Sequence, residues 1–416
     1  MKRFVSAFRG RRDSYQVPLA LAEAGLLDQF ITDAYAVPWL QALARLAPRS
    51  FRAKVDFRFE PGIPAERVRC LWGTTFLEHL RHAAGCSPML TYNKLDRNFS
   101  RATARRAART KSDLFLYSPY AWEAFTARYP HTPRKVLFQY HPHPDTERRL
   151  LAEDSARYPG VGESFSGTRF GQAPEALDPR DRDAWKHADL IFCASSFTKR
   201  SLMDAGCDEA RCRVVPYGVD IPTEVPAAVV TSEFRALFVG SGGQRKGLHH
   251  LLLAWQRAPL PPKSKLTLVC RAIDKGIEKL LAATPGVELL SGVSQGELDR
   301  LYASSSVFIM PSLVEGFGQV YLEALANGCP VLGTTNTGLP DLGGEADGIF
   351  LVAPSDVEEL TGRLERLSSI LPADRQLRFA ARACASRFTW LAFREKLRSA
   401  LKHSNCRSRT NEALRC

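Results

Sequence analysis

Residues 311–324 read Pro-Ser-Leu-Val-Glu-Gly-Phe-Gly-Gln-Val-Tyr-Leu-Glu-Ala, with a short apolar run before them and a helical pattern at their end. Residues 307–310 (Val-Phe-Ile-Met) have the length and composition of a buried parallel strand. Residues 320–326 predict a helix that ends at Asn327-Gly328. Because open α/β sheets bind ligands where the carboxyl end of a strand leads into a helix, we expect a ligand site within this segment.

Two carboxylates flank the glycine turn of this segment, Glu315 before it and Glu323 after it. The glycines allow the backbone to approach a ligand closely. The free N–H groups of residues 318–320 and the dipole of the following helix favour an anion. A ligand with hydroxyl groups at both ends and phosphate in the middle would use all of these features, and a nucleotide-sugar has this order of groups.

The length and charge of the chain indicate its number of domains and the kinds of partner that it favours. A chain of 416 residues is too long for one compact core and suits two domains. The formal net charge is +13, and most of the basic excess lies in residues 1–220. A positive field favours acidic ligands or anionic membrane surfaces. No motif for nucleic-acid recognition is present in the sequence, so we expect no nucleic-acid partner.

The cysteines and the apolar residues indicate the cellular compartment of the protein. Ten cysteines are scattered without a C-x-x-C pair, which favours reduced thiols. The N-terminus begins with strand-like residues rather than the apolar core of a signal peptide, and no run of about 18 apolar residues follows. We therefore expect a cytoplasmic protein, with peripheral contact to the cytoplasmic face of a membrane as a further option.

Strand and helix patterns alternate along both halves of the chain, which parallel sheets require. They predict an N-terminal domain over residues 1–220, a linker over 221–232 and a second domain over 233–387. A last helix over residues 388–402 and a polar, disordered tail over 403–416 complete the chain.

The string Glu315-x7-Glu323 within Pro-Ser-x-x-Glu-Gly-Phe-Gly resembles the signature of the retaining GT-B glycosyltransferases of family 4, also described as glycosyl transferases group 1. Residues 188–199 and 214–220 resemble the interdomain passage of the same family. The resemblance implies an α/β, GT-B fold with two Rossmann-like domains whose parallel sheets face a deep interdomain cleft. It also implies an N-terminal acceptor domain, a C-terminal nucleotide-sugar-binding domain, and a helix over 388–402 that crosses back to the N-terminal domain.

A second glycine-rich loop, residues 240–247 (Gly-Ser-Gly-Gly-Gln-Arg-Lys-Gly), follows a predicted strand over 236–239. It is neither a Walker loop nor the dinucleotide fingerprint, because the lysine and the third glycine are misplaced for those motifs. It resembles the diphosphate loop of the family, in which an arginine and a lysine neutralise the leaving pyrophosphate. Lys246 matches that lysine. The usual position of the arginine holds Ser241 here, and whether Arg245 replaces it stays open.

A histidine, His141, follows the predicted strand over residues 135–140, where side chains face the ligand crevice. In the family a histidine after a comparable strand reaches the donor sugar from the N-terminal domain, and the resemblance gives that role to His141. The alternative is that His141 and His143 belong to a proline-stiffened loop without a role in the site. Metal binding by this His-x-His pair is less favoured because no third ligand is evident, so we expect no metal.

The resemblance thus implies two sets of site residues. The catalytic set is His141, Glu315, Lys246 and Arg245. The set that binds the nucleotide-sugar is Gly240, Gly242, Arg271, Val293, Gly316, Phe317, Gly318, Gln319, Val320 and Glu323. The nucleotide-diphosphate sugar is a co-substrate, so no cofactor is expected.

The implied function is metal-independent, retaining transfer of a sugar, expected to be a hexose, from a nucleotide-diphosphate donor. The acceptor would be a glycan, a lipid-linked molecule or a small molecule, in polysaccharide or glycolipid biosynthesis. The alternative is a GT-B-fold binding or scaffold protein that has lost catalysis, which the altered phosphate loop and the basic N-terminal half would suit.

A basic helix is predicted over residues 93–111, on which Arg97, Arg101, Arg105 and Arg109 share one face. Two interpretations of this face stay open. It is either a solvated surface or a surface that meets anionic lipid or an anionic acceptor.

Overall fold

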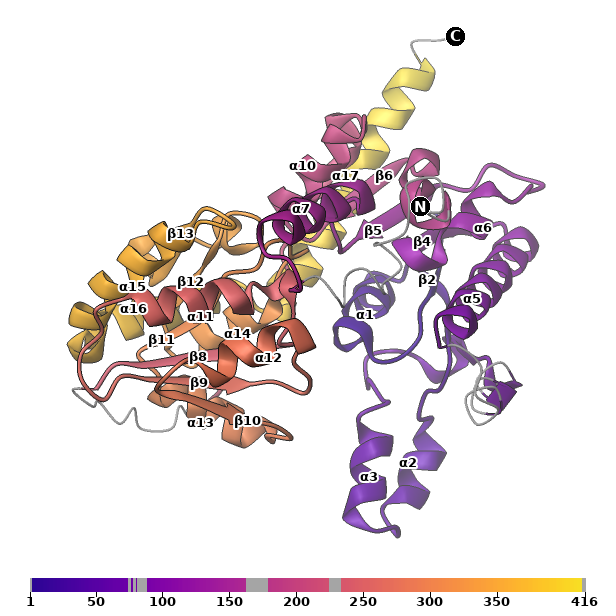
Figure 1. The fold of residues 1–416 in the computed structure, drawn as a ribbon. Helices are drawn as coiled ribbons and strands as arrows, with labels where there is room; N and C mark the ends of the chain where they lie inside the picture. The colour runs from indigo at the N-terminus through magenta and orange to yellow at the C-terminus, as the bar shows by residue number, and fades with distance from the viewer. Residues whose placement is uncertain are drawn as a thin grey trace.

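Two parallel sheets organise the part of the chain that the structure describes (Figure 1). This computed structural model describes residues 2–73, 76–77, 80, 88–161, 179–223 and 233–413. One sheet has seven strands and the other six, and the neighbouring strands pair in parallel throughout both sheets. The prediction of an α/β protein built from two Rossmann-like units is therefore confirmed.

The N-terminal sheet has the order β3-β2-β1-β4-β5-β6-β7. Its strands are β1 Phe4–Ala7, β2 Leu27–Thr32, β3 Val68–Cys70, β4 Asp113–Tyr117, β5 Lys135–Gln139, β6 Leu190–Cys193 and β7 Cys212–Val214. The central strands β1 and β4 are buried along their whole length, which explains their largely apolar sequences. The strand order reverses between β1 and β4, so a ligand crevice is expected beyond their carboxyl ends.

The C-terminal sheet has the order β10-β9-β8-β11-β12-β13. Its strands are β8 Arg235–Val239, β9 Lys265–Val269, β10 Val287–Leu290, β11 Val307–Met310, β12 Val331–Thr334 and β13 Ile349–Val352. Here the order reverses between β8 and β11. The loops that follow these two strands are residues 240–247 and the glycine turn, so the topology brings both predicted ligand loops together.

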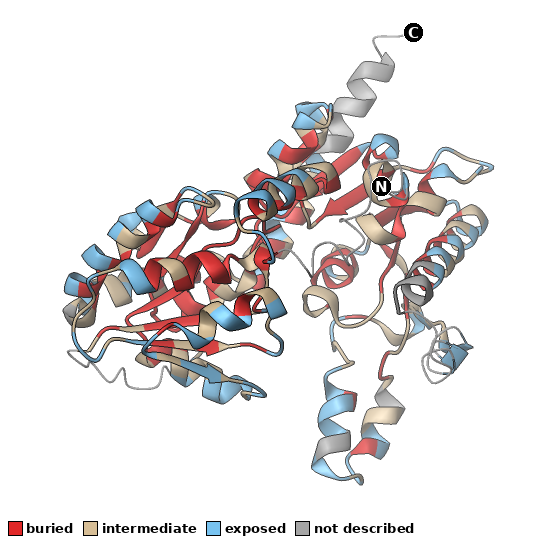
Figure 2. Cartoon of the chain, viewed as in Figure 1, coloured by how far each residue is buried: buried red, intermediate tan, exposed pale blue. Residues whose placement is uncertain are grey.

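Helices connect the strands and cover the sheets. They are α1 Gln16–Glu23, α2 Pro38–Ala44, α3 Arg49–Asp56, α5 Pro88–Thr110, α6 Trp122–Thr126, α7 Pro144–Arg157, α9 Pro179–Arg182, α10 Ser196–Asp204, α11 Leu248–Arg257, α12 Lys275–Ala282, α13 Gln295–Ser304, α14 Gln319–Ala326, α15 Val357–Ile370, α16 Arg375–Ser386 and α17 Trp390–Ala413. Figure 2 shows buried residues concentrated in the strands and in the helix faces that cover them. None of the described helices combines the length and the apolar composition that crossing a membrane requires.

The last helix, α17, packs against the N-terminal unit although it follows the C-terminal unit in sequence (Figure 1). Arg394 Nε lies 3.0 Å from the Glu23 carboxylate of α1, and Phe393 and Leu397 are buried. The sequence predicts an end at residue 402 and a disordered tail, whereas the helix continues to Ala413. The absence of proline and glycine between residues 391 and 413 explains this difference, because nothing in that stretch stops a helix.

The chain crosses between the two units twice, and the two crossings lie side by side. The Val219 N–H donates to the Phe388 carbonyl at 2.9 Å, and Val219 forms a parallel bridge with Thr389. Most of the predicted linker, residues 224–232, lies outside the described residues.

Candidate active site

The glycine turn between β11 and α14 lies where the two units meet. A Cβ atom on Gly316 would stand 1.8 Å from the carbonyl oxygen of Tyr140, just beyond the end of β5. The Gly316 carbonyl accepts hydrogen bonds from Ser195 Oγ at 2.5 Å and from Thr198 Oγ1 at 3.1 Å. Gly318 precedes α14 with φ of +84°, in the left-handed region that favours glycine. Gly316 is thus required by a contact between units, and Gly318 by its backbone conformation.

Glu315 places a buried carboxylate between two cations. Its Oε2 accepts a hydrogen bond from Arg245 Nη1 at 2.9 Å and a shorter one from Lys246 Nζ. Burial by itself raises the pKa of Glu315, but Lys246, Arg245 and His141 oppose this effect and hold that pKa well below its usual range. We call Glu315, Arg245 and Lys246 the charge cluster. It carries more positive than negative charge and therefore favours an anionic ligand.

His141 faces the charge cluster from the N-terminal unit. It follows β5, and its backbone lies beside Gly316. Burial and then the charge of Arg245 lower the pKa of His141 to about 4, so the ring is neutral at pH 7. His143 serves a different purpose, because its ring caps α7 and its Nε2 lies 3.1 Å from the Arg182 carbonyl. Of the two histidines, His141 is the one that the structure places with the charge cluster.

The predicted diphosphate loop, residues 240–247, packs against the glycine turn. Gly247 has φ of +68°, and a Cβ atom there would lie 2.0 Å from the carbonyl oxygen of Pro311. Ser241 is exposed, whereas Arg245 reaches the Glu315 carboxylate from the short turn near the end of the loop. Arg245 therefore supplies the second cation of the charge cluster.

Glu323 stands in the second turn of α14. Its carboxylate is largely buried, and burial raises its pKa. Tyr302 of α13 donates a long hydrogen bond to Glu323 Oε2, at 3.4 Å. A carboxylate accepts several hydrogen bonds, so Glu323 retains capacity for the hydroxyl groups of a ligand.

The other residues predicted to bind the nucleotide-sugar follow the carboxyl ends of neighbouring strands. Gly240 comes directly after β8, Arg271 soon after β9, and Val293 soon after β10. Arg271 is exposed and Val293 half-buried, and Val320 is half-buried in the first turn of α14. The structure brings these residues to the same edge of the sheet as Glu315. An extended ligand that lies across the strand ends would meet such an arrangement.

Three of the predicted residues support the loops themselves. Gly242 is buried, and a Cβ atom there would lie 2.7 Å from the Ile273 side chain. The Phe317 ring is buried against Tyr217 of the interdomain passage, with 5.5 Å between the ring centroids. Gln319 Nε2 donates to a carbonyl of the same passage at 3.5 Å. The side chains of Phe317 and Gln319 therefore hold the turn in place between the units.

The backbone strain in the loop after β1 was not predicted from the sequence, although the loop itself was. Residues 13–15 have φ angles of 46°, 48° and 62°, a costly conformation for residues with side chains. The Arg12 guanidinium lies 4.1 Å above the centre of the Tyr140 ring, and Asp13 Oδ2 accepts a hydrogen bond from Tyr117 Oη at 2.8 Å. Strain at the crevice of the N-terminal sheet marks a second part of the candidate site. The single signal for it in the sequence is a loop rich in arginine after the first strand.

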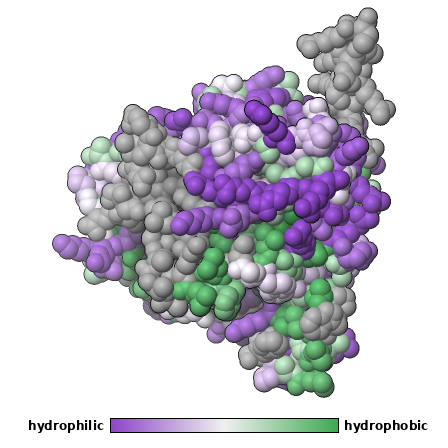
Figure 3. All heavy atoms as spheres, turned by 90° about the vertical axis from the view of Figure 1, so that its right-hand side faces the viewer, coloured by the Kyte–Doolittle hydropathy of each residue, from purple (hydrophilic) through white to green (hydrophobic). Residues whose placement is uncertain are grey.

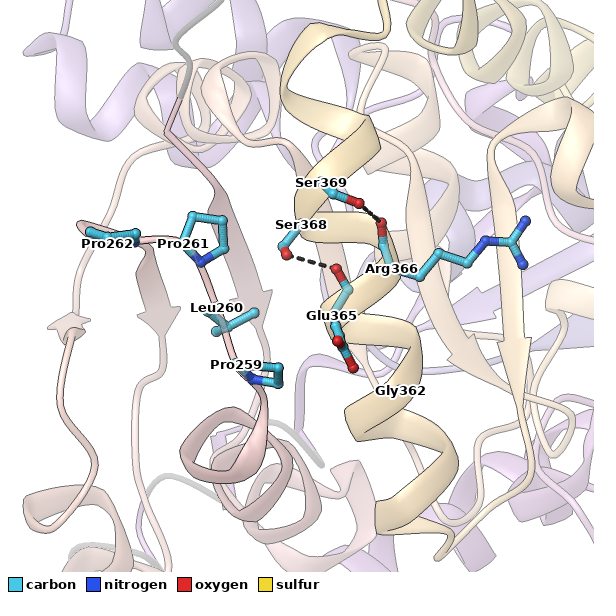
Figure 4. A pocket seen from close by; sticks show the side chains of 9 residues that line it. All are labelled: Pro259, Leu260, Pro261, Pro262, Gly362, Glu365, Arg366, Ser368 and Ser369. Carbon is cyan, nitrogen blue, oxygen red and sulfur yellow. Dashed lines mark hydrogen bonds between the residues drawn. The ribbon is translucent and has the colours of Figure 1, made fainter.

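A hollow of about 680 Å³ lies elsewhere on the C-terminal unit (Figure 4). Residues 259–262 and side chains of α15 line it. Because residues 259–262 precede β9, the hollow lies toward the amino ends of the strands, whereas the glycine turn lies at their carboxyl ends. The hydroxyls of Ser368 and Ser369 donate to carbonyls of their own helix, as Figure 4 shows. The hollow is therefore separate from the candidate site.

The chain has two α/β units with parallel sheets, and the carboxyl ends of the strands of both units meet at the candidate site. This arrangement is that of the GT-B fold. Comparison with family models agrees. Residues 233–369 match the model of glycosyl transferases group 1, and residues 43–222 match that of glycosyltransferase family 4. The chain belongs to the family-4 glycosyltransferases of the GT-B fold.

Curated relatives match part of the chain. The MMP alpha-(1->4)-mannosyltransferase of Mycolicibacterium hassiacum is 31% identical over 207 residues, which cover 49% of this chain and 50% of the relative. The sulfoquinovosyl transferase SQD2 of Arabidopsis thaliana is 36% identical over 230 residues, which cover 51% of this chain and 44% of the relative. The chain thus spans half or less of the length of these relatives.

Solved structures resemble the whole chain in fold. The sucrose-phosphate synthase of Thermosynechococcus elongatus superposes with a TM-score of 0.68 at 18% identity, over 96% of this chain and 99% of that chain. Anabaena HepE, solved in complex with UDP-glucose, superposes with a TM-score of 0.58 at 16% identity, over 97% of this chain and 100% of that chain. At these identities the likeness concerns the fold alone.

Proposed function

We propose that the chain transfers a sugar from a nucleotide-diphosphate donor to an acceptor, with retention at the anomeric carbon and without a catalytic metal ion. The observation that carries the proposal is the charge cluster at the strand ends of the C-terminal sheet, with His141 facing it from the other unit. Membership of the family and the names of the relatives, a mannosyltransferase and a sulfoquinovosyl transferase, support it.

The donor would take over the two cations that Glu315 now holds. Its diphosphate would lie against Lys246, Arg245 and the N–H groups at the start of α14, and its ribose hydroxyls against Glu323. Glu315, once released from the cations, would bind hydroxyl groups of the sugar. The proposal requires no cofactor besides the donor.

The chemical step follows from this arrangement. The bond between the anomeric carbon and the leaving phosphate oxygen breaks, and the acceptor oxygen forms its bond to that carbon on the same face. The acceptor proton passes to the leaving phosphate oxygen. Lys246 and Arg245 stabilise the negative charge that grows on the diphosphate, in a site with little water. His141 is neutral at pH 7 because its pKa is about 4, so it would contact the sugar through a neutral hydrogen bond.

We further propose a glycan or lipid-linked acceptor that reaches the site from the N-terminal unit, and peripheral contact of that unit with an anionic membrane. Arg101, Arg105 and Arg109 are exposed on one face of α5. Arg97 of the same face lies 3.8 Å from Glu123. Three arginines of the predicted basic face are thus directed to solvent, where they would attract an anionic surface.

The second feature that supports membrane contact is apolar. We call residues 38–56, which form α2 and α3, the α2–α3 projection (Figure 1). Leu43 is 57% and Leu46 89% exposed there, and Phe57 directly after it is 54% exposed. Figure 3 shows hydrophobic surface on this lower part of the molecule and strongly hydrophilic surface above it. Apolar side chains next to basic ones are typical of surfaces that bind at a membrane interface.

The decisive experiment combines donor screening with stereochemistry. Purified protein is offered a panel of nucleotide-sugars and candidate acceptors, with and without added manganese, and the anomeric configuration of the product is read by NMR. We expect turnover with a retained configuration. An inverted product, or activity that appears only when manganese is added, would overturn the mechanism.

One observation supports the alternative function, a binding protein without catalytic activity. The position that carries an arginine in the family is the exposed Ser241. The same donor panel separates the two functions, because a binding protein would bind a donor without transferring or hydrolysing it.

A further inference from the structure

A buried cluster of three ligand-type side chains joins the two units beside the diphosphate loop. Asp154 belongs to α7 of the N-terminal unit, and His249 and His250 belong to the first turn of α11 in the C-terminal unit. All three are at most 2% exposed. One ligand atom from each lies within 4.8 Å of the others. We call these three residues the interunit cluster.

Hydrogen bonding accounts for only part of this cluster. His250 Nε2 lies 2.8 Å from Asp154 Oδ1, yet this nitrogen has no hydrogen-bond partner among the described residues. His249 Nε2 lies 3.0 Å from Oδ2, but the oxygen placed to accept its hydrogen bond is Oδ1, at 3.3 Å. The ring nitrogens thus approach the carboxylate closely without pointing along the lines to their nearest oxygens. An ion shared by the two rings and the carboxylate would give the ring nitrogens a partner besides the carboxylate oxygens.

We propose that Asp154, His249 and His250 bind one divalent transition-metal ion, with zinc as the expected ion. Two imidazole nitrogens and one carboxylate oxygen are a donor set that suits zinc, whereas magnesium and calcium prefer sites built from oxygen. A tetrahedral zinc ion with bonds of about 2.0–2.1 Å keeps its ligand atoms roughly 3.4 Å apart. The nitrogen-to-oxygen separations here are 2.8, 3.0 and 3.3 Å, so a small outward shift of the side chains would admit the ion.

The ion would fasten the diphosphate loop to the N-terminal unit. Gln244, next to Arg245 in that loop, donates from Nε2 to the Leu151 carbonyl, Asp154 Oδ2 and Ser155 Oγ, each at 2.9 Å. A metal-bound Asp154 therefore holds Gln244 and positions the adjacent cations. Metal binding itself stands on the geometry of the interunit cluster, and only this positioning effect rests on the proposed function.

The first test is the metal content of the full chain, made without a histidine tag in medium supplemented with zinc. After dialysis into metal-free buffer, elemental analysis should find about one zinc ion per chain. The variant Asp154→Asn/His250→Gln should retain less than a tenth of that amount. His187→Gln, which removes an exposed histidine outside the cluster, should bind zinc as the wild type does.

The second test separates loss of metal from loss of folding. Wild-type protein stripped with chelator should gain several degrees in its thermal midpoint when one equivalent of zinc is added, and the double variant should gain none. Wild-type protein that holds less than a tenth of an equivalent and shows no shift with zinc would overturn the proposal. Lys246→Met should still bind zinc, so failure of this proposal and failure of the proposed function are distinguishable.

Discussion

At the scale of single residues, the central feature of the candidate site is the Glu315 carboxylate, which pairs with both Lys246 and Arg245. Glu315 keeps its negative charge because Lys246 and Arg245 oppose the cost of burial. In return it holds both cations at the carboxyl edge of the sheet. This arrangement prepares a site for an anion before the anion arrives, which is the condition for strong electrostatic stabilisation in catalysis.

Removal of one cation should therefore impair the chemical step more than donor binding. We expect Lys246→Met to lower kcat by roughly 100-fold, which corresponds to about 3 kcal/mol of transition-state stabilisation. Steady-state kinetics with the preferred donor measure this change. Lys279→Met, which removes an exposed lysine of the same unit, is the control and should leave kcat unchanged. A loss confined to KM would contradict the proposed role of Lys246.

Glu323 should act on the nucleotide rather than on the reacting sugar. A charged hydrogen bond to a hydroxyl contributes about 1.5–3 kcal/mol, so Glu323→Gln should raise the donor Kd by an order of magnitude or more. Isothermal titration with the donor and with the free nucleoside diphosphate measures this effect. Glu278→Gln on exposed α12 serves as the control. Equal donor affinity in Glu323→Gln and wild type would rule out the assignment.

At the scale of elements, α5 shows how one helix serves two environments. Arg106 faces inward and pairs with Asp28 of β2, with Nε 2.9 Å from the carboxylate. Arg101, Arg105 and Arg109 face solvent. The helix is thus anchored to the N-terminal sheet by one arginine and presents three others, so the exposed ones can be replaced without disturbing its packing.

Replacement of these three arginines should weaken membrane binding. Each arginine near an anionic surface contributes about 1 kcal/mol, so Arg101→Gln/Arg105→Gln/Arg109→Gln should reduce binding to phosphatidylserine vesicles on the order of 100-fold at low salt. Vesicle co-sedimentation measures it, and donor hydrolysis without acceptor should persist. A matched variant, Arg300→Gln/Arg366→Gln/Arg375→Gln, removes equal charge from exposed positions of the C-terminal unit. Equal loss in both variants, or lost hydrolysis with intact vesicle binding, would refute the role of α5.

At the scale of the whole molecule, the sheet architecture was largely readable from the sequence. The strand over residues 307–310 has the predicted bounds, and those predicted over 236–239 and 135–140 agree with the structure to within one residue, because short apolar runs between turn residues leave little choice of structure. The resemblance to family 4, rather than local patterns, implied that Glu315, Lys246 and Arg245 share a site. The structure brings them together because both loops follow strands at the point where the sheet order reverses.

What the sequence did not reveal depends on contacts between distant residues. His141 and His143 form a His-x-His pair without an evident third ligand in the sequence, whereas the interunit cluster combines adjacent histidines with Asp154, far away in the chain. No local sequence pattern predicts that Asp154 lies next to the two histidines. The strained residues 13–15 were missed for a related reason, because their left-handed backbone is imposed by the buried partners around them.

The bridge between Val219 and Thr389 has a mechanical meaning. Both connections between the units pass through this one place, so the axis of a rotation between the units would lie near it. When one unit rotates against the other, atoms near this axis hardly move, and the displacement of an atom grows in proportion to its distance from the axis. We expect any opening of the site to be a rotation about this place, which the contacts of the interunit cluster would oppose.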